Sequence, residues 1–130
     1  MKISTCLLCA AIIMLVSACQ KNDIAVISQS SLIGIWKLDA NFYGTGSAPT
    51  WYPVAKDDNH TVQFNADGTL GGNEYSQYYG YKVKDSLLTL NSAADAELRL
   101  LYAIKHDTLT ITPAPPLMCI EGCAVRFIKQ

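Results

Sequence analysis

Residues 96–105 read Ala-Glu-Leu-Arg-Leu-Leu-Tyr-Ala-Ile-Lys, and apolar side chains recur at every second position along them. One set of alternate positions holds Ala96, Leu98, Leu100, Tyr102 and Ile104. The charged residues Glu97, Arg99 and Lys105 fall mostly on the other set. A period of two is that of a β-strand, whereas a helix would spread these charges around its circumference. The stretch therefore predicts a strand with one buried face.

Seven more strand-like stretches occur from residue 32 onward, separated by turn-forming residues. They are 32–40, 61–64, 69–75, 78–83, 87–90, 108–112 and 123–129. Between two of them, Asn65-Ala66-Asp67-Gly68 predicts a tight hairpin with Gly68 at positive φ. The prolines Pro113, Pro115 and Pro116 predict a connection outside the sheet. The chain is therefore predicted to be all-β, with eight strands.

Short turns join most of these strands to their neighbours in the sequence. Eight antiparallel strands in meander order can close into a small up-and-down β-barrel, which removes the exposed sheet edges. The interior of such a barrel is about wide enough for side chains or for one small ligand. An open sandwich of the same strands is the alternative, and the composition does not separate the two.

Residues 1–18 have the layout of an export signal, because Lys2 is the only charge and an apolar run precedes two small residues. The run is too short to cross about 30 Å of hydrocarbon as a permanent helix. Val16-Ser17-Ala18-Cys19 resembles a bacterial lipobox. The resemblance implies cleavage before Cys19 and attachment there of diacylglycerol and a further acyl chain such as palmitate. A plain secretory signal is the alternative.

This reading divides the chain into a signal peptide at 1–18, a lipidated polar tether at 19–31 and a barrel domain at 32–130. No acidic residue directly follows Cys19, which favours an outer-membrane location, on the periplasmic face or at the cell surface. The formal net charge is −1, with acids and bases interspersed and no basic block. We therefore expect a membrane partner through the lipid anchor and no nucleic-acid partner.

Cys119 and Cys123 are the cysteines that remain after Cys19 is lipidated. An exported compartment is oxidising, so a disulfide between them is the default expectation. The alternative is a metal site, but two thiolates need two further ligands, and His60 and His106 show no ligand spacing. We expect no metal and no cofactor.

Gly34-Ile35-Trp36, at the start of the first of eight meander strands, resembles the Gly-x-Trp signature of lipocalins. In that family an arginine from the end of the barrel packs across the tryptophan, and Arg126 is the matching position here. Together with the lipobox and the terminal Cys-Ile-Glu-Gly-Cys, the arrangement resembles small lipocalin-like lipoproteins of Bacteroidota. The central Thr-Asp-Tyr motif of lipocalins has no counterpart in this chain. The resemblance implies a barrel more firmly than a function.

The longest segment predicted to be irregular, residues 41–60, corresponds to the loop that covers the barrel mouth in lipocalins. It suggests Tyr43, Trp51 and Tyr52 as ligand contacts, with capping of the core as the alternative role of Trp51. The alternation also assigns inward faces to Tyr79, Tyr81 and Tyr102. Tyrosines in those places either line a cavity or fill the barrel.

No arrangement of nucleophile, base and acid stands out, since the pair His106-Asp107 has no partnered serine or cysteine. Asp57-Asp58-Asn59-His60 gathers polar groups but lacks the spacing of a calcium loop, which favours a solvated turn. We therefore predict a non-enzymatic, membrane-anchored barrel that binds a small hydrophobic ligand. The alternative is a protein-interaction module, an inhibitor or an accessory subunit of a surface complex, that uses the rim loops 41–60 and 113–122.

Overall fold

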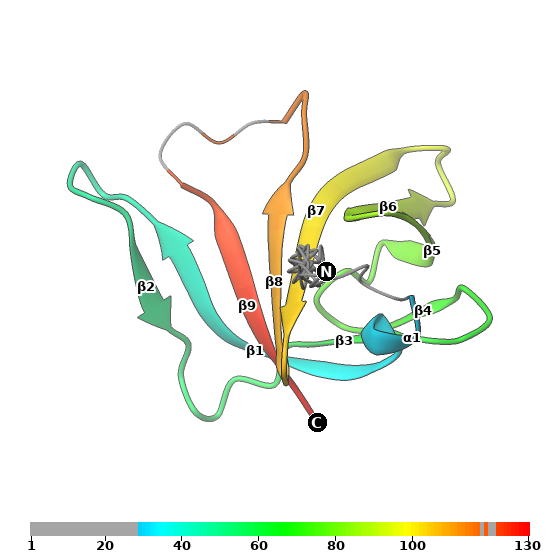
Figure 1. Ribbon diagram of the computed structural model, residues 1–130, viewed down its shortest axis with the longest axis horizontal. Helices are drawn as coiled ribbons and strands as arrows, with labels where there is room; N and C mark the ends of the chain where they lie inside the picture. The colour runs from blue at the N-terminus through cyan, green and yellow to red at the C-terminus, as the bar shows by residue number, and fades with distance from the viewer. Residues whose placement is uncertain (1–28, 118, 120–121) are drawn as a thin grey trace, which may run out of the picture.

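The computed structural model describes residues 29–117, 119 and 122–130. In this part of the chain a single helical turn, α1 (Gln29–Leu32), precedes the strands, and every strand belongs to one antiparallel sheet (Figure 1). The strands are β1 (Gly34–Tyr43), β2 (Thr50–Pro53), β3 (Thr61–Phe64), β4 (Leu70–Gly72), β5 (Tyr78–Lys84), β6 (Leu87–Ser92), β7 (Glu97–Lys105), β8 (Thr108–Pro113) and β9 (Ala124–Lys129). The predicted all-β class is confirmed.

The strands follow one another around the sheet in the order β4-β3-β1-β9-β8-β7-β6-β5. The short strands β2 and β3 pair with successive halves of the same edge of β1, from Tyr43↔Thr50 to Ala40↔Pro53 and from Lys37↔Thr61 to Gly34↔Phe64. They therefore share one position, and the nine strands fill eight positions. The predicted eight-stranded antiparallel barrel is confirmed as a barrel-like sheet, in which β1 pairs with β9.

One seam of this barrel is not sealed. Between β4 and β5 the described residues form a single bridge, Thr69↔Gly80, beside a hydrogen bond from Tyr81 N to Gly68 O of 2.9 Å. Beyond the bridge the two strands separate, and Tyr75 from the connecting segment and Tyr78 at the start of β5 pack against the core. Side chains rather than strand hydrogen bonds therefore close the wall at this point.

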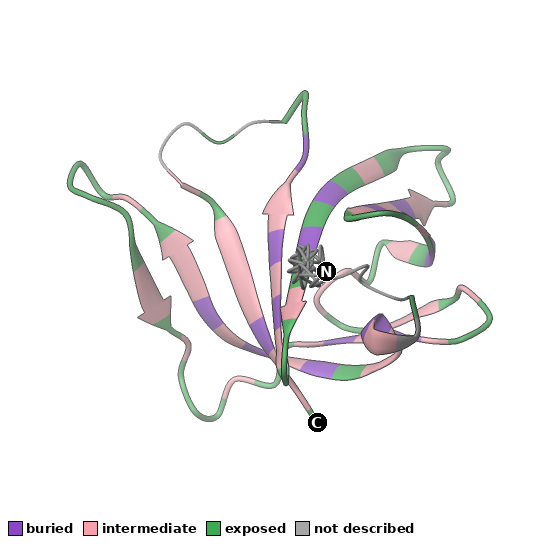
Figure 2. Cartoon of the chain, viewed as in Figure 1, coloured by how far each residue is buried: buried purple, intermediate pink, exposed green. Residues whose placement is uncertain are grey.

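The core lies on the inner face of the sheet, which we define as the face that carries the buried side chains. Strand β7 follows the predicted alternation: Leu100 and Tyr102 are buried, whereas Leu101 and Ala103 are exposed (Figure 2). The side chains that are fully buried and largest by volume are Trp36, Phe64, Phe127, Leu32, Leu88, Leu90, Leu109, Ile111 and Val62. They lie on α1 and on strands β1, β3, β6, β8 and β9, so the core joins elements from both ends of the described chain.

The segment 41–60 differs from the prediction of one long irregular loop. Strand β1 continues to Tyr43, and β2 returns along it as the second strand of a hairpin. Aromatic pairs explain why: Phe42 packs on Trp51 with ring centroids 5.1 Å apart, and Tyr43 stacks on Tyr52 at 4.4 Å. Such cross-strand pairs stabilise a two-stranded ribbon.

The predicted hairpin at Asn65-Ala66-Asp67-Gly68 is confirmed. Gly68 has φ +85°, and its N–H donates to Asn65 O over 3.1 Å. The Asp67 carboxylate accepts from both the N–H and the hydroxyl of Thr69, at 2.9 and 2.6 Å. These two hydrogen bonds lower the pKa of Asp67 below its usual value, because they favour the charged form.

Candidate ligand site at the mouth of the barrel

A bulge in β1 changes which side chains face inward near the mouth of the barrel. The register with β9 shifts between Leu38↔Phe127 and Ala40↔Arg126, so that Asn41 pairs with Val125. Asn41 and Tyr43 then lie on the same face as the core, and Phe42 packs with Trp51 on the outer face. The one-residue shift at Asp39 therefore sets which residues line the mouth.

A cavity of about 330 Å³ opens at this end of the barrel, above the buried core. Leu100 and Ile111, both buried, form its apolar floor together with Val125. Tyr43, which is 41% exposed, and Tyr75 stand at its sides. A volume near 300 Å³ is at the small end of the range for ligand pockets. Such a cavity suits a small, mainly apolar molecule.

Tyr75 was not singled out by the sequence as a site residue. It lies between β4 and β5, where the unsealed seam directs its ring inward to the core and the cavity. Burial, with a smaller contribution from the neighbouring Glu74 carboxylate, raises the pKa of Tyr75 far above its usual value. Its hydroxyl therefore remains protonated and able to donate a hydrogen bond.

The six tyrosines and tryptophans predicted to contact a ligand do not form one group. Tyr43 lines the mouth cavity and Tyr52 stacks on it, whereas Trp51 lies on the opposite face of the sheet. The lid position predicted for Trp51 is therefore not what the structure shows. The reason is the β1–β2 pairing, which places neighbouring residues of β2 on opposite faces.

Tyr81 and Tyr102 are buried, as predicted, but as parts of the core rather than as lining of the mouth cavity. The Tyr81 hydroxyl donates to Asn65 O over 2.6 Å. The Tyr102 hydroxyl is buried and has no hydrogen-bond partner among the described residues, and burial raises the pKa of both groups. The inward orientation predicted for Tyr79 is wrong: this residue is 62% exposed, because a bulge between Tyr78 and Gly80 turns it outward.

The Gly-x-Trp motif sits at the closed end, with a partner other than the predicted one. Trp36 is fully buried, and its indole N–H donates to Leu32 O over 2.7 Å. The cation over its ring is Lys129, with Nζ 5.1 Å from the ring centroid. Gly34 permits this approach, since a Cβ there would lie 3.1 Å from Lys129 Cε.

Arg126 therefore does not pack across Trp36. It lies on the outer face, with its guanidinium carbon 4.8 Å from the centroid of the Trp51 ring, and Nε donates to Asp39 Oδ2 over 2.6 Å. The prediction failed because Arg126 and Lys129 are three residues apart on β9, and strand alternation places residues at odd spacings on opposite faces.

A second hollow, of about 430 Å³, lies on the outer face beside Trp51. Its lining includes Phe42, Leu101 and Pro115, together with the predicted disulfide Cys119–Cys123, which is present. Leu101 is 40% exposed. This outer groove is apolar and is lined by residues of β1, β2, β7, β8 and β9 together with the connection that follows β8.

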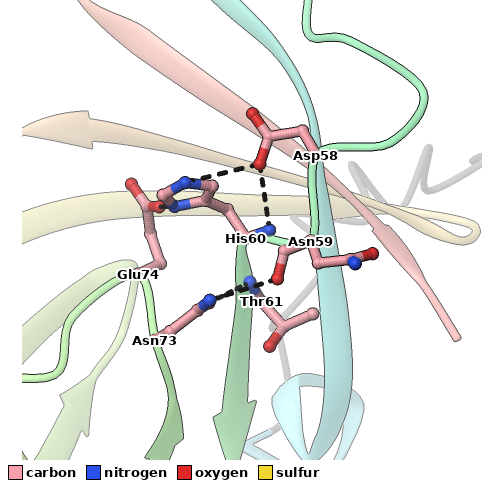
Figure 3. Close-up of polar contacts among 6 residues, drawn as sticks. All are labelled: Asp58, Asn59, His60, Thr61, Asn73 and Glu74. Atoms are coloured by element: carbon pink, nitrogen blue, oxygen red, sulfur yellow. Dashed lines mark hydrogen bonds and ion pairs between the residues drawn. The ribbon is translucent and has the colours of Figure 1, made fainter.

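A polar cluster joins the segment before β3 to the end of β4 (Figure 3). His60 lies between two carboxylates, with Nδ1 2.8 Å from Glu74 Oε2 and Nε2 3.4 Å from Asp58 Oδ1. Asn73 Oδ1 accepts from Thr61 N over 2.7 Å. Among the described residues no group of three or more histidine, cysteine, aspartate or glutamate side chains is arranged to hold a metal ion. These contacts hold the turn before β3 against Asn73 and Glu74, which follow β4.

The fold and the cavity define a class: a small barrel-like antiparallel sheet with an apolar hollow at its mouth, consistent with a lipocalin-like fold. No model of a protein family matches this chain, and no curated protein or solved structure shows significant similarity to it. Within the described residues, no helix has the length and apolar character needed to span a membrane.

Proposed function

We propose that this domain is a lipocalin-like binding module that holds a small hydrophobic ligand in the mouth cavity. The cavity is the observation that carries the proposal, because its floor of Leu100, Ile111 and Val125 is a continuation of the core surface. When a ligand covers apolar surface that is open to water at this position, the free energy of binding becomes more favourable by roughly 25 cal/mol per Å². Sequestration by shape and burial needs neither a catalytic group nor a cofactor.

Filling the cavity tests this role. Replacing Asn41 by tryptophan places an indole in the mouth, and we expect it to abolish retention of a bound ligand. The matched control is Ala103→Trp, which adds the same side chain at an exposed position on the outer face of β7. Residues 20–130, which include every strand of the described structure, are expressed into the periplasm and measured by native mass spectrometry with organic extraction.

A discrete extra mass in the unchanged domain and in Ala103→Trp, but absent from Asn41→Trp, is the expected result. An unliganded mass that persists after incubation with a membrane lipid extract would contradict ligand binding. Equal retention by both variants would place the ligand elsewhere on the domain and would contradict the mouth cavity as its site.

We also propose that the chain is anchored to the outer membrane through lipid on Cys19. Support comes from the lipobox-like Val16-Ser17-Ala18-Cys19, which lies outside the described residues. Labelled palmitate supplied to cells is expected to enter the full chain and to be absent from Cys19→Ala. Incorporation into Cys19→Ala equal to that of the unchanged chain would contradict the anchor.

A protein-interaction role is the second candidate, favoured by the outer groove at Trp51 and Leu101. Exposed apolar surface of this kind is typical of contact sites. This role predicts that Leu101→Asp, on the outer face, removes binding to a cell-surface protein, measured by cross-linking in intact cells. Asn41→Trp should then leave that cross-link unchanged, and cross-linking that survives Leu101→Asp would count against the outer groove.

A further inference from the structure

The mouth cavity carries no charge. The described residues that line it are apolar or neutral, and its polar side chains are amides and hydroxyls, including Asn41, Tyr43 and Tyr75. The two cations of β9 are engaged elsewhere: Arg126 with Asp39 and Trp51 on the outer face, and Lys129 over Trp36 at the closed end. An anionic ligand would therefore find no cation within the lining.

The lining does offer hydrogen-bond donors. Tyr75 lines the cavity with its ring partly buried against the core, and its side chain makes no hydrogen bond to another described residue. The hydroxyl is protonated at neutral pH, as in any tyrosine, and burial raises the pKa of Tyr75 further. Asn41 adds an amide at the same opening. A ligand acceptor placed here would satisfy groups that are otherwise partly removed from water.

The cost of burying charge then separates ligand classes. Moving an ionised carboxylate into an apolar site without a partner is far more costly than moving a neutral polar group that gains a hydrogen bond. This cost favours the neutral form of a ligand over the ionised form of the same size.

We propose that the mouth cavity selects neutral ligands that carry a hydrogen-bond acceptor, such as medium-chain amides, alcohols or esters, and discriminates against fatty-acid anions. This inference rests on the proposed function and names the ligand class of that same site. At the packing density of protein interiors, a cavity of 330 Å³ accommodates a ligand of about 12–16 non-hydrogen atoms.

Decanamide and decanoate make a matched pair for the test, because they have the same shape and differ in charge at pH 7.5. Binding of each to residues 20–130 is measured by isothermal titration calorimetry. We expect decanamide to bind at least tenfold more tightly, which corresponds to about 1.4 kcal/mol. Equal affinities, or tighter binding of decanoate, would overturn the neutral-ligand inference and leave the proposed binding function intact.

Tyr75→Phe identifies the donor, since it removes the hydroxyl and keeps the ring. It is expected to weaken decanamide binding about fivefold to tenfold with little effect on decanoate. Tyr79→Phe, at an exposed tyrosine that does not line the cavity, is the control and should change neither affinity. Unchanged decanamide affinity in Tyr75→Phe would contradict the hydroxyl's role. If neither compound binds, the proposed function fails, and the inference fails with it.

Discussion

Replacing Trp36 by alanine is expected to lower the free energy of unfolding by about 4 kcal/mol, in the range measured for buried aromatic residues. The whole side chain is buried, so alanine leaves a cavity at the closed end of the barrel. It also leaves Leu32 O without the indole N–H and removes the ring beneath Lys129 Nζ. Chemical denaturation monitored by circular dichroism measures the loss.

Two further variants separate the contributions at Trp36. Trp36→Phe keeps most of the apolar volume and loses the hydrogen bond, so we expect it to lower the free energy of unfolding by about 2 kcal/mol. Trp51→Ala removes an indole that is half-buried on the outer face and should cost about 1–2 kcal/mol. A loss for Trp51→Ala as large as that for Trp36→Ala would show that the closed end is not the principal packing site.

Gly72→Ala is also expected to have a large effect: it should lower the free energy of unfolding by about 3 kcal/mol or more. Gly72 has φ +90°, which costs an L-residue roughly 1–2 kcal/mol. A Cβ there would also lie 2.8 Å from the Thr61 carbonyl carbon and 2.9 Å from Val62 Cα. The Thr61 backbone cannot retreat easily, because its oxygen accepts from Asn73 N and Glu74 N at 2.9 and 3.0 Å.

Gly46→Ala isolates the conformational part of that effect, and the difference between the two variants gives the steric part. Gly46 has a similar φ of +80°, but nothing lies within 4 Å of a Cβ at this position. We expect it to cost only about 1 kcal/mol, the conformational part alone. Thermal unfolding of the two variants side by side is the measurement, and equal losses would contradict the close approach at Gly72.

The sequence was sufficient to predict every strand except β2 and, away from the bulges, the buried faces of these strands. The alternation in 96–105 placed Leu100 and Tyr102 inward, and both are buried. The hairpin at 65–68 and the disulfide Cys119–Cys123 were also predicted correctly. These features depend on local periodicity, turn chemistry and short spacing, which a single sequence displays directly.

The candidate site was harder to predict because it depends on bulges and on the unsealed seam. A bulge shifts every later side chain of a strand to the other face, so the period of two misassigned Tyr79 and did not predict which of Asn41 and Phe42 faces inward. Tyr75 reaches the cavity only because β4 and β5 separate. No local pattern marks either event.

The pairing of β1 with β9 has a consequence for the order in which the protein acquires its structure. The register that begins at Trp36↔Lys129 joins positions about 90 residues apart, and Gln130 N donates to Ile35 O over 3.0 Å. Closing so long a loop is slow compared with forming the local hairpins β5–β6 and β7–β8. A nascent chain that still lacks β9 leaves one edge of β1 unpaired, so the barrel cannot be completed before β9 has been synthesised.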